Sequence, residues 1–145
     1  MHRRQCLQTS LAAPAVLSTA PALSAQKNTP LKSKINVAIL GCGLRGQSHV
    51  NLMLQREDCV VTAITDIDPE MVRRTKAIFE KHNKPLPTFY TDGPKDYLNL
   101  LEKEDLDAVI IASPWRWHTP MAVAAMQAGL YVGTEVCGAF SIDEC

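Results

Sequence analysis

The 145-residue sequence predicts an α/β fold in which helices cover both faces of a doubly wound parallel sheet. Short apolar segments alternate along the chain with longer amphipathic segments, an order typical of β-α-β units. The connections between them are short, which favours parallel strands joined by right-handed crossovers. A glycine-rich turn after the first apolar segment indicates where a ligand would bind.

The first strand is predicted at residues 35–40 (INVAIL), directly before the pattern G-x-G-x-x-G. Gly41 is expected to make the tight turn, Gly43 to face a nucleotide pyrophosphate, and Gly46 to let the next helix pack closely. That helix is predicted at about 45–55, with its positive N-terminal dipole end toward the phosphates. Glycine-rich turns are common, but one placed between a strand and a helix is typical of a dinucleotide-binding (Rossmann) fold.

A second buried strand is predicted at residues 59–65 (CVVTAIT), and it ends at Asp66. A carboxylate there can accept hydrogen bonds from both adenosine ribose hydroxyls and would repel a 2′-phosphate. The alternative is that Asp66 only opens the following turn. Asp68 is expected to cap the next helix, predicted at about 69–82, with Pro69 in its first position.

Arg73 and Arg74 could in principle bind the extra phosphate of NADP. Both lie well inside the predicted second helix, whereas Asp66 lies at the end of its strand. The sequence therefore favours NAD as the cofactor.

Residues 88–90 predict a short strand, and residues 94–103 predict an amphipathic helix with Tyr97, Leu98 and Leu101 facing inward.

The clearest central strand after the first is predicted at residues 107–112. Thr119 is expected to cap the following helix, with Pro120 in its first position and Gly129 at its end. Residues 130–134 predict the final strand.

Two further groups follow strand ends, at the edge where open parallel sheets bind ligands. Trp115, Arg116, Trp117 and His118 follow the central strand, and Glu135 follows the last one. We expect these residues to contact the cofactor. Alternatively, both tryptophans pack the edge of the domain, His118 is an ordinary residue at a helix entry, and Glu135 stabilises a turn.

Residues 1–25 are predicted to be an export signal of the twin-arginine type. Arg3 and Arg4 precede an apolar run rich in Ala and Ser, which is too short to remain as a membrane span. The protein is therefore expected in the periplasm of a bacterium. The alternative is an unstructured cytosolic extension with a chance Arg-Arg pair. Residues 26–33 predict a polar linker, and the binding domain is predicted at residues 34–145.

Composition narrows the range of partners. The formal net charge is zero, which gives no argument for nucleic acid or an anionic membrane surface. The five cysteines show no C-x-x-C spacing, so neither a metal site nor a disulfide framework is predicted.

The combined motifs resemble the N-terminal domain of the Gfo/Idh/MocA oxidoreductase family. The resemblance rests on G-x-G-x-x-G, Asp66, the H-x-P-like residues 118–120, and residues 128–132 (AGLYV) leading to Glu135. Most members carry Glu-Lys-Pro after that strand, and the lysine assists hydride transfer near the nicotinamide. Here Val136 follows Glu135, so that lysine is missing.

A narrower resemblance is to glycoside hydrolase family 109. It rests on residues 44–49 (LRGQSH), 114–123 (PWRWHTPMAV) and 135–141 (EVCGAFS). The resemblance implies an α-N-acetylgalactosaminidase that keeps NAD tightly bound. Oxidation of the sugar at C3 acidifies the C2 proton, the aglycone leaves by elimination, water adds, and the hydride returns.

The resemblance also implies residue roles. Leu44 and Arg45 would meet the pyrophosphate through their backbone, and Asp66 would bind the ribose. Six residues would line the nicotinamide half: Trp115, Arg116, Trp117, His118, Glu135 and Val136.

The substrate domain of the family, an α+β domain that supplies the acid/base residues and sugar contacts, is expected to be absent from this chain. The catalytic residues are therefore unassigned, and the chain alone is expected to be inactive. The alternatives are a sugar oxidoreductase of the wider family and a non-catalytic nucleotide-binding fragment. Whether a full-length form is a homo-oligomer stays open.

Overall fold

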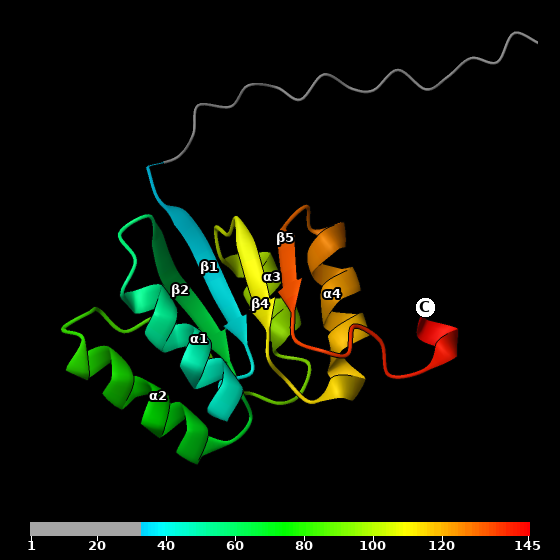
Figure 1. The fold of residues 1–145 in the computed structure, drawn as a ribbon, viewed down its shortest axis with the longest axis horizontal. Coiled ribbons are helices and arrows are strands. Elements are labelled where there is room, and N and C mark those ends of the chain that lie inside the picture. The colour runs from blue at the N-terminus through cyan, green and yellow to red at the C-terminus, as the bar shows by residue number, and fades with distance from the viewer. Residues whose placement is uncertain (1–32) are drawn as a thin grey trace, which may run out of the picture. The chain divides into compact units, whose positions relative to one another are not determined.

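Five parallel strands form one sheet in the computed structural model, which describes residues 33–145 (Figure 1). They are β1 (Ile35–Leu40), β2 (Cys59–Thr65), β3 (Thr88–Tyr90), β4 (Ala108–Ile111) and β5 (Tyr131–Thr134), in the spatial order β3-β2-β1-β4-β5. The chain moves outward from β1 to β3 and then returns to the other side of β1 for β4 and β5. This is the doubly wound parallel sheet that the sequence predicts.

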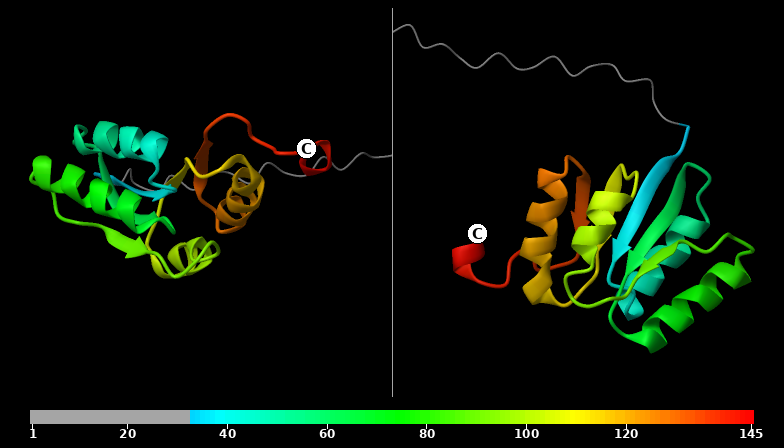
Figure 2. Two further views of the ribbon diagram at one scale, coloured as in Figure 1. Left: turned by 90° about the horizontal axis from the view of Figure 1, so that it is seen from below. Right: turned by 180° about the vertical axis from the view of Figure 1, so that it is seen from behind.

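Two helices cover each face of the sheet (Figures 1 and 2). Helices α1 (Leu44–Leu54) and α2 (Pro69–Lys81) share one apolar core with the sheet, and α3 (Tyr97–Lys103) and α4 (His118–Gln127) share the other. Strand β1 contributes to both cores, because alternate side chains point to opposite faces. Val37 and Ile39 belong to the first core, and Ala38 and Leu40 to the second.

The carboxyl ends of the strands lie level with one another. Leu40 is paired with Thr65 of β2 and with Ile111 of β4, and Ile111 is paired in turn with Thr134 of β5. The residues that follow each strand therefore gather along one edge of the sheet. The winding direction reverses between β1 and β4, and open α/β sheets bind ligands at such a switch point.

Helix α2 begins as predicted. One oxygen of the Asp68 carboxylate accepts hydrogen bonds from the N–H groups of Glu70 (2.8 Å) and Met71 (3.4 Å), and Pro69 is the first helical residue. The carboxylate satisfies donors that have no partner inside the helix.

The prediction for α3 is partly wrong. The helix begins at Tyr97 rather than at residue 94, because the Asp96 carboxylate accepts hydrogen bonds from the Asp92 N–H and the Asn99 amide and holds a turn before it. Leu98 is 45% exposed, and Leu100 is fully buried in its place. Once Tyr97 faces the core, helical spacing brings Leu100 and not Leu98 to the same face.

The start of α4 also differs from the prediction. The helix begins at His118, directly after a short 3₁₀ turn at Trp115–Trp117, so Thr119 lies inside the first turn and is not the cap. Its hydroxyl donates instead to the Gly138 carbonyl at 3.2 Å. The end is as predicted, with Gly129 at φ +81° just beyond the last turn.

Within residues 33–145, no helix is long and apolar enough to cross a membrane. The predicted export signal at residues 1–25 and all but the last residue of the predicted linker lie outside the described residues.

Candidate functional site

A cleft of about 460 Å³ lies at the carboxyl ends of β1, β2 and β4, at the switch point of the sheet. The structure brings seven of the predicted site residues into its wall: Gly41, Gly43, Leu44, Arg45, Asp66, Arg116 and Trp117. The other five predicted residues lie outside this lining: Gly46, Trp115, His118, Glu135 and Val136.

The three glycines of the motif differ in what surrounds them. A Cβ added to Gly41 would lie 2.7 Å from the Ser113 nitrogen, and one added to Gly46 would lie 2.0 Å from the Gly41 carbonyl oxygen. Protein packing therefore explains these two glycines. A Cβ on Gly43 would meet no neighbouring atom of the described residues within 4 Å. Open space beside Gly43 fits an outside group that approaches the backbone closely.

The N-terminus of α1 points its donors at this space. Gly43 is the N-cap residue, no side chain caps the helix, and its first turn contains no acid. The N–H groups of the first turn have no acceptor within the helix, and the helix dipole adds positive potential there. This donor set fits the pyrophosphate of a dinucleotide.

Asp66 follows β2 at the same edge. Its Oδ2 accepts a hydrogen bond from the Cys42 N–H at 2.6 Å, and its Oδ1 accepts one from the Asp68 N–H at 2.9 Å. The contact with the Asp68 N–H stabilises the turn after β2, which is the role of Asp66 in the alternative interpretation. Each carboxylate oxygen can accept a further hydrogen bond, so the geometry fits both interpretations. The ribose contact stays a prediction.

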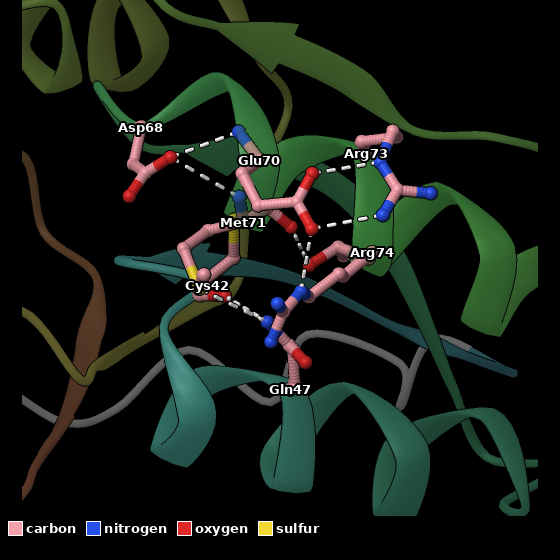
Figure 3. A network of polar contacts seen from close by, with 8 residues as sticks. Cys42, Gln47, Asp68, Glu70, Met71, Arg73 and Arg74 are labelled. Atoms are coloured by element: carbon pink, nitrogen blue, oxygen red, sulfur yellow. Dashed lines mark hydrogen bonds and ion pairs between the residues drawn. The ribbon is translucent and has the colours of Figure 1, made fainter.

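Sequence reasoning missed Gln47, which joins the glycine turn to α2 (Figure 3). Its amide donates to the Cys42 carbonyl at 2.9 Å and lies 3.5 Å from the Met71 sulfur. Burial raises the pKa of the Cys42 thiol to about 12, and the side chain packs in the core on the α1 and α2 face of the sheet. No local pattern singles out Gln47, because its partners come from two separate segments.

The tryptophans of the 3₁₀ turn have different surroundings. Trp117 lies in the wall of the cleft and also packs edge-on against Tyr97 of α3, with ring centroids 6.3 Å apart. Trp117 therefore both faces the cleft and packs against the domain, as the alternative interpretation of the two tryptophans predicts in part. Trp115 is 58% exposed and borders a separate hollow with Phe140.

His118 is buried beneath the site and does not lie on its surface. Its Nδ1 is 2.6 Å from the Cys137 carbonyl oxygen, and its Nε2 is 2.8 Å from the Ser113 carbonyl oxygen. The imidazole thus connects the loop after β4 with the segment after β5. Any influence of His118 on a cofactor would act by positioning these two segments.

Glu135 links the end of β5 to α1. Its Oε1 lies 2.7 Å from the Arg45 Nε and 2.6 Å from the His49 Nε2. Hydrogen bonds from Arg45 and His49 hold the pKa of Glu135 below its ordinary value. Sequence reasoning missed His49, although its i, i+4 spacing from Arg45 puts both on one face of α1.

Within residues 33–145, no group of His, Cys, Asp and Glu is arranged to hold a metal ion. An uncapped helix N-terminus, an open glycine and a carboxylate at the end of the next strand together define a dinucleotide-binding α/β domain.

The comparisons identify the family. The family model of the Gfo/Idh/MocA oxidoreductases, described as an NAD-binding Rossmann fold, matches residues 35–145. The chain belongs to this family, and NAD is its cofactor.

Its curated relatives confirm the narrower resemblance. The chain is 43% identical over 112 residues to an α-N-acetylgalactosaminidase from Tannerella forsythia, and 42% identical over 113 residues to a glycosyl hydrolase family 109 protein from Parabacteroides distasonis. Each alignment covers 77% of this chain and 24% of the relative. The chain thus spans about a quarter of the length of these relatives.

Solved structures agree on the fold. Myo-inositol 2-dehydrogenase from Lactobacillus plantarum superposes with a TM-score of 0.64 at 25% identity, covering 77% of this chain and 30% of that one. Scyllo-inositol dehydrogenase from Lactobacillus casei, solved with NAD(H) and scyllo-inositol, superposes with a TM-score of 0.63 at 22% identity. This superposition covers 77% of this chain and 30% of that one.

The glycine turn gives a first prediction. Gly43→Val puts a branched side chain into the open space, so NAD binding should be lost while the free energy of unfolding falls by no more than about 1 kcal/mol. Gly46→Ala should instead lower the free energy of unfolding by about 1–3 kcal/mol, because its Cβ overlaps the Gly41 carbonyl. Urea unfolding and calorimetric NAD titration measure both. A Gly43→Val protein that retains NAD through gel filtration would contradict the pyrophosphate assignment.

The ribose contact is tested by Asp66→Ala. Loss of two charge-assisted hydrogen bonds should weaken NAD binding by roughly 1.5–3 kcal/mol and weaken NADP binding less. Asp58→Asn is the matched control, because it removes the same charge at the start of β2, where Asp58 pairs with Arg56. Calorimetry that finds equal affinity for the two cofactors before and after the change would refute the assignment.

The lowered pKa of Glu135 predicts an acid-dependent stability. A carboxylate whose pKa falls on folding stabilises the protein above its unfolded pKa, and this contribution disappears as the pH falls through the folded pKa. The melting temperature of the wild-type protein should therefore exceed that of Glu135→Gln at neutral pH. The difference between the two melting temperatures should disappear as the pH falls below the ordinary pKa of a glutamate. Glu102→Gln, on the exposed face of α3, should show no such closing gap. A gap that is constant with pH would show that Glu135 acts without its charge.

Proposed function

We propose that residues 34–145 form the NAD-binding part of a redox-type glycosidase that hydrolyses terminal α-N-acetylgalactosamine and restores its bound NAD in every cycle. The name of one relative, at 43% identity, supports this substrate class, and a second relative at 42% identity is named as a glycosyl hydrolase of family 109. The observation that carries the proposal is the end of β5, where Val136 takes the position at which the wider family has a lysine.

Val136 is 78% exposed and has no proton to give or accept. The cations among the described residues of the cleft wall are Arg45 and Arg116, with no lysine. Ordinary dehydrogenation of a sugar hydroxyl needs a group that takes its proton, and arginine stays protonated in proteins. Neither Val136 nor these arginines can therefore take that proton, and because the first oxidation of the proposed cycle also releases it, the group that accepts it would come from another domain.

In the proposed complex, different groups of residues bind different parts of the cofactor. The backbone N–H groups at Leu44 and Arg45 bind the pyrophosphate, and Asp66 binds the adenosine ribose. The nicotinamide half lies against Trp115, Arg116, Trp117 and Glu135-Val136, with His118 holding the two loops in place beneath it.

Bound NAD would supply a reversible hydride acceptor. Most glycosidases use a pair of carboxylates on either side of the scissile bond, and the NAD-dependent enzymes are exceptions. The acids of the cleft, Asp66 and Asp68, follow β2 on the ribose side. A ketone in the sugar ring acidifies the neighbouring C–H bond, so the aglycone can leave by elimination without a carboxylate nucleophile. The acid/base groups for that step would come from a domain outside this chain.

We also propose that the protein is exported through the twin-arginine route. Arg3 and Arg4 before an apolar run support this. A route that carries folded proteins suits a domain that must take up NAD where the cofactor pool lies. Replacement of both arginines by lysine should retain the protein in the cytosol, as measured by cell fractionation.

The glycosidase proposal is tested with an aryl α-N-acetylgalactosaminide. Residues 34–145 alone should release no aglycone even when NAD is saturating, because the acid/base groups that must come within about 3 Å of the sugar's reacting atoms are proposed to lie in another domain. The product of the full reading frame, if it continues into a second domain, should release aglycone without accumulating NADH. Accumulation of NADH in stoichiometric amounts would favour the sugar oxidoreductase of the wider family. Turnover by residues 34–145 alone would refute the proposal that another domain supplies the acid/base groups.

A further inference from the structure

A second feature of α2 bears on which cofactor the site accepts. Glu70, in the first turn, binds Arg73 through both carboxylate oxygens, at 2.7 Å from Nε and 2.8 Å from Nη2. One of these oxygens also accepts from the Arg74 Nε at 2.8 Å. Figure 3 shows both guanidinium groups gathered around this carboxylate. Hydrogen bonds from Arg73 and Arg74 lower the pKa of Glu70 to about 2, so it stays charged at neutral pH.

One member of this cluster, Arg73, lies in the wall of a hollow next to the predicted ribose site. A hollow of about 640 Å³ beside the cleft is lined by Asp66, Ile67, Pro69, Arg73 and Lys76, among others. Asp66 lines both the cleft and this hollow, so the hollow adjoins any ribose that Asp66 binds. Lys76 lies over the Phe89 ring, 4.9 Å from its centroid. Arg73 is thus a cation on the wall of the space that a 2′-phosphate would enter.

A phosphate needs guanidinium donors that are free to bind it, and Arg prefers bidentate binding to an anion. Arg73 already makes such a bidentate pair with Glu70. Glu70 also adds a negative charge to those of Asp66 and Asp68 at the start of α2. At Arg73 a 2′-phosphate would therefore meet donors that are already occupied, and the carboxylates of Asp66 and Asp68 would repel it.

We propose that Glu70 is a specificity-determining residue, which favours NAD over NADP by occupying Arg73, the arginine in the wall of the hollow. Asp66 binds the ribose directly, whereas Glu70 acts by keeping the Arg73 guanidinium engaged in an ion pair. The inference rests on the assignment of the ribose site to Asp66. A Glu70 that served only to stabilise α2 would change both cofactor affinities equally, so the ratio of the two affinities is the informative measurement.

The experiment compares Asp66→Ala with Asp66→Ala/Glu70→Gln in the whole chain. Calorimetry with NAD and NADP gives the four affinities, and circular dichroism with thermal melting confirms that both proteins fold. Freeing the two arginines should tighten NADP binding by roughly tenfold or more, while the NAD affinity changes by less than about twofold. The gain should shrink as salt is added, because it comes from exposed charges.

Two controls separate this effect from a general change of charge. Asp66→Ala/Asp58→Asn removes the same charge and frees Arg56 at the start of β2, so it should give no gain in NADP affinity. Adding Arg73→Ala and Arg74→Ala to the double variant should abolish the gain. An unchanged NADP affinity in the Glu70→Gln double variant, or an equal gain in the Asp58→Asn control, would overturn the inference. A wild-type protein that prefers NADP would overturn the ribose assignment itself.

Discussion

The site depends on one contact that only glycine permits. The Gly41 carbonyl lies where a side chain at position 46 would begin, with 2.0 Å between that oxygen and an added Cβ. Because residue 46 lacks a side chain, α1 starts directly against the turn that ends β1. Its first N–H groups therefore open onto the switch point between β1 and β4, where the cleft lies. A bulkier residue would move the whole helix and the anion site with it.

Two contacts across the sheet edge then fix the surroundings of that helix end. Glu135 connects the end of β5 to Arg45 and His49 of α1, and His118 connects the segments after β4 and β5. The connected residues are far apart in sequence but level at one edge, because all five strands are parallel and the ends of β1, β4 and β5 are paired with one another. Loops that are held before a ligand arrives lose less conformational freedom on binding, which favours tight retention of a cofactor.

Sequence patterns predict the fold well and the side-chain contacts poorly. The strands at residues 35–40, 59–65 and 88–90 are confirmed to the residue, because these runs are short, rich in β-branched or aromatic residues and bounded by turns. The predictions that Leu98 faces inward and that Thr119 caps α4 are wrong, since the Asp96 carboxylate and the 3₁₀ turn at Trp115–Trp117 set those starts. Gln47 and His49 were missed because their partners lie in other segments. Whether the predicted site residues bind NAD stays a prediction.

The surroundings of the two proposed halves of the cofactor differ in how many charged and hydrogen-bonding groups the described residues provide. On the proposed ribose side, Asp66 and Asp68 lie in the cleft wall and the Glu70 cluster follows in the first turns of α2. Toward the proposed nicotinamide half, Trp115, Val136 and Phe140 lie outside the cleft lining, are largely exposed and carry no ionisable group. Burying apolar surface of this kind is favourable, so these side chains suit contact with a cofactor ring or another part of the protein. In the proposed enzyme this domain decides which dinucleotide is held, and the groups that move the sugar's protons come from elsewhere.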